Sequence, residues 1–524
     1  MKTPVRKSMI ASWLLRAGPW PWIALSVVDR LGLIYLFASR YVSTDDSVMW
    51  HAAVDFAHGR FHGPYFYGQS YGPMLEALVA APLVRTGIPM NVLMPGVTSL
   101  LALLPYWSFA LWFHRQGRGL AAMLMAALPL LMPVEFGLMT TMCRGFITGA
   151  AVLALLPWAS NILHPRSRSF VIGAVVSVAW FVNPNSLVFS VPFLVHYLLT
   201  SERRLRCGLM TALGTVVGLS AHIAAQHWCQ VHAERIVHTL IDPRPRFAPA
   251  RIAEGLGNLD AHFQWLMPVI WPYGSLLGIW LIVLIAVGLI RKESPLAISL
   301  VLGAAIICGA FTVDKVHDGW DSVFFPLSRM FLCLPLLVAW ATAALLSTAR
   351  TRVWMMGVML FACCATATIH ALSTERIARQ QIHDLTRWVA VRPVPLLQDD
   401  ARRLGIISER YGIGLIVPLG VPSAIHCQFR AYAYPVLEPA LPPTYLAGYE
   451  RRYWFREAFS GAIVPNLLFV GGEPEPWAAV VATDPRFMPI PDKGPDMVHV
   501  LVGNTVPTDS LVRSLMQRIY PEHK

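Results

Sequence analysis

The amino-acid sequence predicts a polytopic α-helical membrane protein of about 11 transmembrane helices with a C-terminal extracytoplasmic α/β domain. The first observation is composition: of 524 residues, 55% are hydrophobic and only 14% are charged, which leaves too little polar surface for a soluble globular protein. The second is a series of apolar runs of about 20 residues that recurs as far as residue 372. The third is a change after residue 373, where charged residues become frequent.

Each apolar run is long enough to cross a hydrocarbon core about 30 Å thick as one helix. The basic residues Lys2, Arg6 and Lys7 precede the first run, an arrangement that resembles a signal peptide. That run is too long and lacks a small-residue cleavage site, so we expect a retained first helix with its N-terminus in the cytoplasm. The runs lie near residues 19–39, 92–113, 120–140, 146–163, 207–228, 268–290, 296–313, 328–347 and 353–372.

Residues 170–200 could form one kinked helix or two short ones. Basic segments flank this stretch, and because positively charged loops stay in the cytoplasm, an even number of crossings must separate them. We therefore predict two helices of about 14 residues, which turn at Asn183, Pro184, Asn185 and Ser186. Helices this short span only about 21 Å, so the turn should lie within protein or a wet cavity near the outer leaflet.

This topology places several segments on the outer face: residues 43–60, the loops 229–267 and 314–327, and everything after residue 373. The predicted division is a transmembrane bundle over residues 1–372 and an extracytoplasmic α/β domain over residues 373–524. Short strand-like runs between Pro and Gly turns favour the α/β domain, namely NLLFVGG, AAVVATD and MVHVLVGN.

The formal net charge of +12 does not indicate nucleic-acid binding. Many Lys and Arg residues lie in short loops between the apolar runs, which is the positive-inside bias of membrane proteins. The eight cysteines show no zinc spacing and lie mostly inside apolar runs, so we expect them to be small core residues. The lipid bilayer is the predicted partner, and a bacterial inner (plasma) membrane is the expected location.

Two adjacent aspartates, Asp45 and Asp46, follow the first apolar run. Ser43 lies three residues before Asp46, as in a capping box, and acids in the first turn favour the positive end of a helix dipole. On this interpretation the pair only starts a helix. One cap does not require two acids, however, and a carboxylate at the outer surface is well placed to take a proton from a hydroxyl that arrives from water. Asp45 is the expected base.

The next segment, GPYFYGQSYGPMLEALVAAPL, is rich in Tyr, Gly and Pro. It then becomes amphipathic, with Glu76 expected on its polar side. Aromatic faces and hydrogen-bonding groups are what sugar sites use, so Tyr67, Gln69, Tyr71 and Glu76 are candidate substrate-binding residues. The alternative is that the tyrosines, including Tyr65, form an interfacial aromatic belt.

Four features together resemble the GT-C superfamily: the apolar first helix, the outer acidic pair, the pattern GPYFYGQSYGPMLEA, and CRGF at the outer end of the third span. GT-C proteins are membrane glycosyltransferases that use polyprenyl-phosphate sugars, akin to protein O-mannosyltransferases and the aminoarabinose transferase of lipid A. The motif likeness covers residues 20–200, and the remainder is similar only in architecture.

The resemblance implies inverting transfer of a hexose or pentose from a polyprenyl-phosphate donor to an extracytoplasmic acceptor, which could be a protein, a lipid or a glycan. In this family an aspartate of the first outer loop is the catalytic base, which corresponds to Asp45 or Asp46. The adjacent DD differs from the usual Asp-Glu or Asp-x-Asp spacing, which leaves open which of the two acts. A second acidic motif has only Glu135 as a candidate, so a divalent metal is possible and undecided.

Such a transfer needs a cation beside the departing phosphate. The outer-face candidates are Arg144, Arg329, Lys315 and Arg60. Arg329 and Arg144 each open an apolar run, at the depth where a lipid phosphate would lie. The alternative for each is a snorkelling or structurally paired arginine.

Two other groups of polar residues have competing interpretations. Asp29 and Arg30 lie midway along the first apolar run, and we expect each to pair with another helix in a structural role, with a proton pathway as the alternative. His51, Asp55 and His58 share one helical face. They could bind a metal, but a surface helix also needs a polar side.

A membrane transporter or flippase for lipid-linked sugars or other solutes is the alternative function. It should show interrupted helices repeated in two related halves with charges at the midplane. Only residues 183–186 and the Asp29–Arg30 pair fit that pattern. A non-catalytic assembly protein would not need acids in the first outer loop, so the sequence favours the glycosyltransferase.

Overall fold

The computed structural model describes residues 17–237, 248–346, 353–383, 391–419, 425–446, 450–471, 474–490 and 498–520. The chain packs into two compact units. The helical unit comprises Met1–Ala38, Pro95–Ala224 and Arg244–Asp384, and the mixed unit comprises Ser39–Met94, Ala225–Pro243 and Leu385–Lys524. This division differs from the predicted one at residue 373, because two segments from the first half of the chain pack with the C-terminal region.

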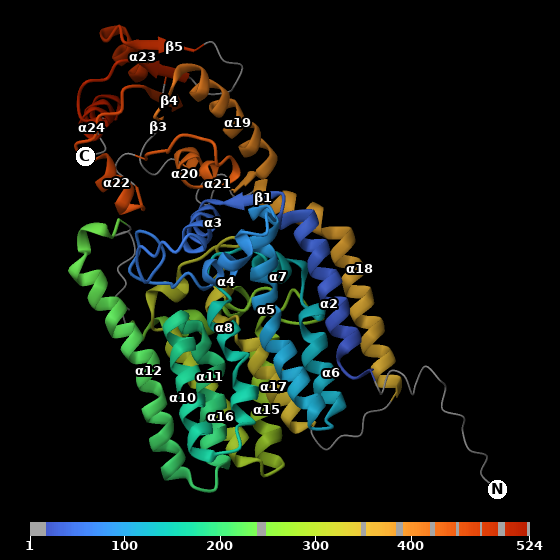
Figure 1. Ribbon diagram of the computed structural model, residues 1–524. Helices are drawn as coiled ribbons and strands as arrows, with labels where there is room; N and C mark the ends of the chain where they lie inside the picture. Colours follow the sequence, from blue (N-terminus) through green and yellow to red (C-terminus); the bar gives the residue numbers. More distant parts are fainter. Residues whose placement is uncertain are drawn as a thin grey trace, which may run out of the picture. The chain divides into compact units, whose positions relative to one another are not determined.

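The helical unit consists of helices of very different lengths (Figure 1). Four described helices are long and apolar enough to cross a membrane by length and composition, at Trp20–Ala38, Met90–Arg115, Arg204–Val231 and Trp354–Ile382. Shorter apolar helices include Gly119–Leu131, Thr148–Ser160, Ser275–Ile290, Ser294–Ala310 and Leu334–Leu345. Most of the predicted runs therefore hold helices, whereas the total of about 11 crossings remains a prediction.

The helices of this unit have the following bounds. They are α2 Trp20–Leu33 with a π-helical extension Ile34–Ala38, α5 Met90–Arg115, α6 Gly119–Ala127, α7 Val134–Met139, α8 Thr148–Leu153, α9 Leu156–Ser160, α10 Pro165–Val182, α11 Leu187–Thr200, α12 Arg204–Val231, α13 Arg251–Gly257, α14 Leu259–His262, α15 Ser275–Ile290, α16 Ser294–Ala310, α17 Leu334–Leu345 and α18 Val353–His383. Short 3-10 turns lie at Leu128–Leu131, Pro184–Ser186, Ala233–Arg235, Asp314–His317 and Leu327–Phe331.

Prolines explain why two predicted spans are broken. The run near 120–140 divides into α6, a 3-10 turn and α7, since Pro129 and Pro133 lack the N–H that a continuous helix requires. The run near 146–163 divides into α8 and α9, with Pro157 at the start of the second helix. Each of these two predicted spans therefore consists of two short helices.

The predicted turn between two short helices is confirmed. α10 ends at Val182, a 3-10 turn covers Pro184–Ser186, and α11 begins at Leu187. The Asn183 side chain accepts a hydrogen bond from the N–H of Asn185 and so caps the turn. Asn185 and Ser186 are buried, so the turn lies within protein as expected for backbone at membrane depth.

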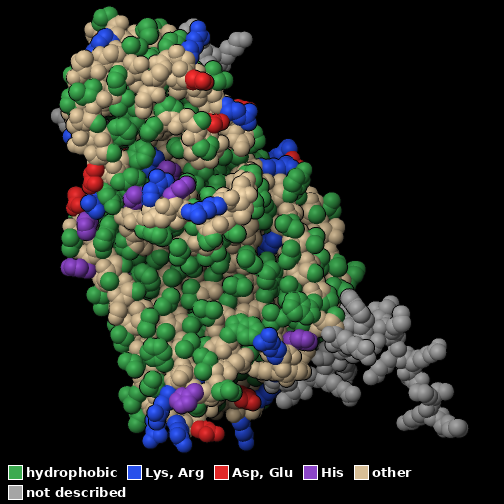
Figure 2. Space-filling model, in the orientation of Figure 1, with side chains coloured by type: hydrophobic (Ala, Val, Ile, Leu, Met, Phe, Trp, Pro, Cys, Tyr) green, Lys and Arg blue, Asp and Glu red, His purple; other side chains and the backbone are tan. Residues whose placement is uncertain are grey.

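The helical unit exposes many apolar side chains on its surface. A broad band of hydrophobic side chains covers its helices in Figure 2. Many of the exposed residues on α12 are apolar, among them Leu209, Leu213 and Ile223. A soluble protein rarely exposes apolar area on this scale, whereas a bilayer-embedded helix needs it.

The mixed unit contains a four-stranded sheet in the order β3-β4-β6-β5, with β3 and β4 parallel and the other pairs antiparallel. Its core is formed by buried residues of the strands and of α23 and α24, including Phe469, Trp477 and Leu515. The elements are β1 Tyr41–Ser43, α3 Thr44–Ala57, α4 Leu75–Val84, β2 Val391–Pro393, α19 Val394–Tyr411, β3 Leu415–Leu419, α20 Ile425–Tyr432, α21 Tyr434–Leu437, α22 Tyr453–Phe459, β4 Leu467–Gly471, α23 Pro474–Thr483, β5 Phe487–Pro489, β6 Val498–Leu501 and α24 Thr508–Ile519.

Two of the three predicted strands are confirmed: NLLFVGG contains β4 and MVHVLVGN contains β6. The prediction for AAVVATD was wrong, because its residues 478–483 belong to α23. Trp477 and Val480 lie three residues apart and are both buried, which is the helical spacing of a core-facing stripe.

A small antiparallel ribbon joins the first outer segment to the C-terminal region within the mixed unit. β1 pairs with β2 in the register Tyr41–Pro393, Val42–Arg392 and Ser43–Val391. The N–H of Val394 also donates to the carbonyl of Arg40 at 2.8 Å. This pairing fixes the start of α3, which carries the acidic pair, against residues from the last quarter of the chain.

Candidate functional site

The two adjacent aspartates have different environments. Asp46 forms a capping box with Ser43: its Oδ2 accepts the Ser43 N–H at 2.9 Å, and the Ser43 Oγ accepts the Asp46 N–H at 3.3 Å. Asp46 is therefore buried at the start of α3. Asp45 retains a 29% exposed side chain, and its Oδ1 lies 3.4 Å from Nη1 of Arg451. The helix-starting role belongs to Asp46, so Asp45 is the acid that a substrate could reach.

Arg451 was missed in the sequence, although its surroundings carried a signal. The segment ERRYWF over residues 450–455 combines charged and aromatic side chains more densely than its neighbours. The structure brings this segment to α3 within the mixed unit, 406 residues along the chain from Asp45. The backbone N–H of Arg451 donates to the Tyr432 hydroxyl at 3.0 Å, which holds the arginine in position.

A buried ion pair supports the same segment. Arg452 is fully buried and donates from Nε and Nη2 to the two carboxylate oxygens of Glu450, at 2.7 and 2.8 Å. Its Nη2 also donates to the Thr444 carbonyl at 2.7 Å. The guanidinium lies 3.9 Å from the centroid of the Phe455 ring. This bidentate geometry fixes the backbone on both sides of Arg451.

A second acid lies further along α3. The Asp55 carboxylate accepts from the Tyr67 hydroxyl at 3.0 Å and pairs with Arg60 at 3.0 Å. The Nε2 atoms of His51 and His62 each lie 3.8 Å from its Oδ2. Burial raises the pKa of Asp55, while Arg60 and the Tyr67 hydrogen bond oppose that shift. Arg60 and Tyr67 are thus tied to Asp55.

An aromatic pocket adjoins this cluster in the mixed unit. The His62 ring stacks on Trp454 with centroids 3.4 Å apart, and Tyr67 meets the Trp454 ring edge to face at 4.8 Å. Tyr65 accepts from Gln226 at 3.1 Å. The pocket holds about 20 Å³, room for one water molecule, so a sugar could enter only after side chains move. Its other lining residues include Phe66, Gly68, Gln69, Trp228, Arg235, Arg451 and Tyr453.

The structure places the four candidate substrate-binding residues, Tyr67, Gln69, Tyr71 and Glu76, in different environments. Tyr67 and Gln69 line this pocket, and Tyr71 lies half-buried in the same loop. The expectation that Glu76 lies on an exposed polar side was wrong, because Glu76 is fully buried. The exposed face of α4 is apolar, with Leu78 and Leu83 on it, as suits a helix against lipid, and the carboxylate consequently points inward.

The imidazole of His62 makes this cluster sensitive to pH. Burial and then the charge of Arg60 lower the pKa of His62 to about 4. Since the unfolded chain binds this proton near pH 6.5, His62 contributes stability above pH 6.5 that is lost as pH falls toward 4. We expect His62→Phe, which keeps a ring on Trp454, to reduce the fall in melting temperature between pH 7 and pH 5. An unchanged fall in thermal scans of the purified chain would argue against this role.

The metal alternative for α3 does not fit. His58 is exposed, and its Nδ1 contacts the Val54 carbonyl at 2.7 Å, so it does not join His51 and Asp55. Asp55 is already engaged by Arg60 and Tyr67. Across the described ranges, no group of three or more His, Cys, Asp or Glu residues is placed to hold a metal ion.

A cationic cluster lies in the helical unit, where two predicted arginines meet one loop. Nη1 of Arg144 donates to the carbonyl of Phe324. Arg329, in the 3-10 turn Leu327–Phe331, donates to the carbonyls of Pro326, at 2.7 Å, and of Asp318, and lies 3.8 Å from the Phe325 ring centroid. Arg144 lies in the bend that precedes α8, and the 3-10 turn of Arg329 precedes α17.

Lys315 belongs to the same cluster. Burial and then the neighbouring Arg329 lower its pKa to about 8, against the opposite influence of Asp318. Nearby cations repel one another, so an anion bound among them would be stabilised. The Asn183–Ser186 turn connects the two arginine segments: Asn185 Nδ2 donates to the carbonyls of Phe146 and Arg329, at 2.7 and 3.2 Å.

The charged pair inside the first span has structural partners, as predicted. Asp29 Oδ1 lies 2.7 Å from Nδ1 of His370 on α18. Arg30 donates to the Gly137 carbonyl and to the Thr140 hydroxyl, at 2.9 and 2.7 Å. His370 also contacts the Met132 carbonyl through Nε2 at 3.0 Å. These contacts tie three parts of the helical unit together.

The fold and these side chains define a helix-rich protein with apolar helices, an accessible acid beside an aromatic pocket in one unit and a cationic cluster in the other. No protein-family model matches the sequence, and no curated protein matches it.

Solved structures of ArnT from Cupriavidus metallidurans are similar to this chain. The structure of ArnT bound to undecaprenyl phosphate matches with a TM-score of 0.46 and 16% identity, and the apo structure with 0.48 and 15%. Each comparison covers 92% of this chain and 98% of the other. A likeness of this degree assigns no role to any residue.

Proposed function

We propose that this protein is an integral membrane glycosyltransferase that moves a sugar from a polyprenyl-phosphate donor to an acceptor on the extracytoplasmic side. The observation that carries the proposal is the difference between the environments of Asp45 and Asp46. Asp46 caps α3, whereas Asp45 is partly exposed and held by Arg451 beside aromatic side chains. A carboxylate that is not needed for the cap, and that water can reach, suits a general base.

The proposed reaction is a single displacement with inversion. The Asp45 carboxylate takes the proton of the acceptor hydroxyl while the acceptor oxygen forms a bond to the anomeric carbon. The bond between that carbon and the phosphate oxygen breaks, and its electron pair leaves with the polyprenyl phosphate. Arg451 orients Asp45 through the contact to Oδ1. No step is assigned to a metal.

Cations are required where negative charge develops. In this proposal Arg329, Lys315 and Arg144 of the cationic cluster stabilise the leaving phosphate. Tyr67, Gln69 and Tyr71 contribute to a sugar-binding surface on which aromatic faces contact the ring. Glu76 is no longer proposed as a direct ligand, because it is buried. The transporter alternative drew on the charges of Asp29 and Arg30 inside the first span. Both have structural partners, so they do not favour transport.

The leaving-group assignment predicts a loss of rate in Arg329→Gln. We expect the release of polyprenyl phosphate to fall about 10²- to 10³-fold, measured by mass spectrometry in membranes of the producing cells, which supply the acceptor, after addition of polyprenyl-phosphate-linked hexoses and pentoses. Arg329→Lys should retain part of the rate because it keeps the positive charge.

The matched control for this prediction is Arg251→Gln. Arg251 lies on α13, is 39% exposed and pairs with Asp314 at 3.3 Å, so its loss should leave the release unchanged. Equal rates in Arg329→Gln and Arg251→Gln would remove Arg329 from the mechanism. Thermal melting of both variants separates a catalytic loss from the loss of the carbonyl contacts of Arg329.

A further inference from the structure

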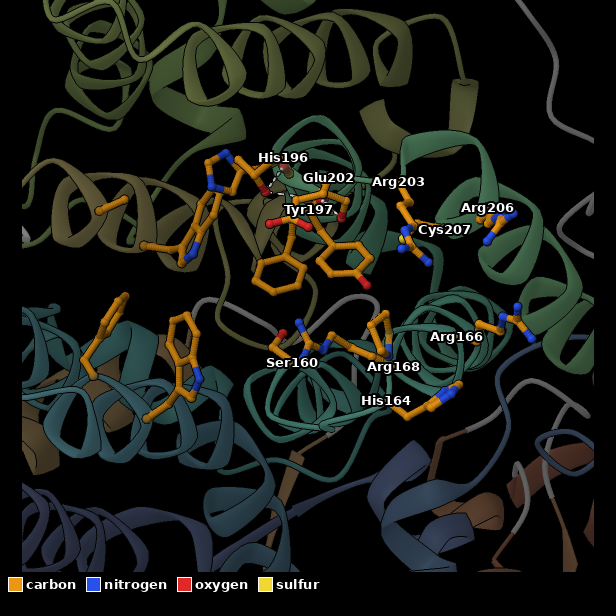
Figure 3. Close-up of a pocket in the computed structure, with 18 of the residues that line it drawn as sticks. Ser160, His164, Arg166, Arg168, His196, Tyr197, Glu202, Arg203, Arg206 and Cys207 are labelled. Atoms are coloured by element: carbon orange, nitrogen blue, oxygen red, sulfur yellow. Dashed lines mark hydrogen bonds between the residues drawn. The ribbon is translucent and has the colours of Figure 1, made fainter.

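A large basic pocket opens in the helical unit, at the end that the charge pattern predicts to face the cytoplasm. It holds about 940 Å³ and lies where α10, α11 and α12 meet the ends of α5, α9 and α17. Among the described residues that line it, Glu202 is the one carboxylate, against the five arginines Arg118, Arg166, Arg168, Arg203 and Arg206. In Figure 3, Ser160, His164 and Arg168 face His196, Tyr197 and Glu202 across the pocket.

The arginines of the pocket are not neutralised by acids. Within the described ranges, no ion pair with a carboxylate involves any of the five arginines. Arg118 donates to the Ala343 carbonyl at 2.9 Å and lies over the Phe113 ring at 4.4 Å. Arg168 donates to the Ile162 carbonyl at 2.7 Å. An anion with several oxygens would therefore satisfy charges that the protein itself leaves uncompensated.

The inner wall of the pocket is aromatic rather than polar. Trp340 lies 5.6 Å from the Phe193 ring and 5.2 Å from the His196 ring. Trp112 and Phe113, with centroids 4.9 Å apart, complete this wall. Nδ1 of His196 is buried without a hydrogen-bond partner in the described part of the chain. The pocket thus combines a cationic mouth with an apolar interior.

Close backbone packing joins the two helices that carry arginines of the basic mouth. α10 carries Arg166 and Arg168, and α12 follows Arg203 and carries Arg206. A Cβ on Gly214 would lie 2.0 Å from the Phe170 carbonyl oxygen, and one on Gly218 would lie 2.3 Å from the Ser177 backbone. This small-residue spacing lets the two helices approach closely, as in membrane helix pairs.

The rim identifies the source of the anion. Leu163 and Leu205 are 92% and 79% exposed beside the pocket arginines, and α12 continues with exposed apolar residues along its length. A soluble phosphate would gain nothing from these leucines, whereas acyl chains would cover them. We propose that this pocket binds the phosphate headgroup of an anionic membrane lipid of the cytoplasmic leaflet, with its chains on the exposed face of α12. This inference is independent of the proposed transfer reaction.

Native mass spectrometry of the purified, delipidated full chain tests the proposal. The chain is titrated with cardiolipin, phosphatidylglycerol and phosphatidylcholine. We expect one tightly bound anionic lipid per chain, and Arg203→Gln/Arg206→Gln should weaken its binding at least about tenfold. Lysine at both positions should restore most of the binding. The matched control, Arg204→Gln/Lys292→Gln, removes two exposed charges that do not line the pocket.

Three results would overturn the proposal. The first is equal binding of anionic lipid and phosphatidylcholine, and the second is equal losses in the two double variants. The third comes from a separate titration with inorganic pyrophosphate: if it displaces bound cardiolipin at micromolar concentration, the pocket recognises a free phosphate compound rather than a lipid. All three readouts measure binding alone, so they hold whether or not the chain transfers a sugar.

Discussion

Replacing Asp45 by asparagine is expected to lower kcat for release of polyprenyl phosphate by about 10²- to 10⁴-fold, the usual contribution of a general base. Asparagine keeps the shape of the side chain and cannot accept the acceptor proton. Binding of the lipid donor should change little, because in this mechanism the cations of the helical unit hold the phosphate. The measurement is kcat at saturating lipid-linked sugar in membranes of the producing cells, which supply the acceptor, with donor binding to the purified chain followed separately.

Asp46→Asn is the matched control, one residue away. Asparagine retains an oxygen that can accept the Ser43 N–H, so α3 should start at the same residue and the rate should remain within a few-fold of the parent chain. A chain that is inactive as Asp46→Asn and active as Asp45→Asn would reverse the assignment. Equal, full activity in both variants would remove the acidic pair from the chemistry.

Arg452→Met should be the most destabilising change in the mixed unit. It leaves the Glu450 carboxylate buried without its bidentate partner and deprives the Thr444 carbonyl of a donor. Breaking a buried pair in this way typically costs about 3–5 kcal/mol. We expect the unfolding transition of this unit to move down by roughly 10 °C, followed by tryptophan fluorescence.

Two further variants separate the cost of breaking the buried Glu450–Arg452 pair from the cost of removing any arginine. Glu450→Leu/Arg452→Met removes both charges together and should recover much of the lost stability. Arg513→Met removes an exposed arginine that pairs with Asp509 four residues earlier in α24, and should cost less than about 1 kcal/mol. Similar losses in Arg513→Met and Arg452→Met would contradict the importance of the buried pair.

Local patterns in the sequence were enough to predict most of the helical unit. Apolar run length located α2, α5, α12 and α18, and the balance of basic loops located the turn at residues 183–186. The capping box of Ser43 and Asp46 was also readable, since it depends on residues three positions apart. These features are fixed by neighbours in the chain.

Contacts between distant segments could not be predicted. The ribbon of β1 and β2 has three residues in each strand, too short for a recognisable signal, and it makes residues 39–94 part of the mixed unit. The partner of Asp45 lies in a segment whose charges and aromatic rings have many possible uses before packing is known. The burial of Glu76 and the helix at AAVVATD show the same limit, because tertiary packing decided both.

The proposed mechanism depends most on the side of the membrane that α3 faces. Cysteine placed at exposed His58 should react with a membrane-impermeant maleimide in intact cells, in a background without Cys308 and Cys364, whereas cysteine at exposed Arg204 should react only after permeabilisation. The reverse pattern would place Asp45 in the cytoplasm and contradict the proposed enzyme.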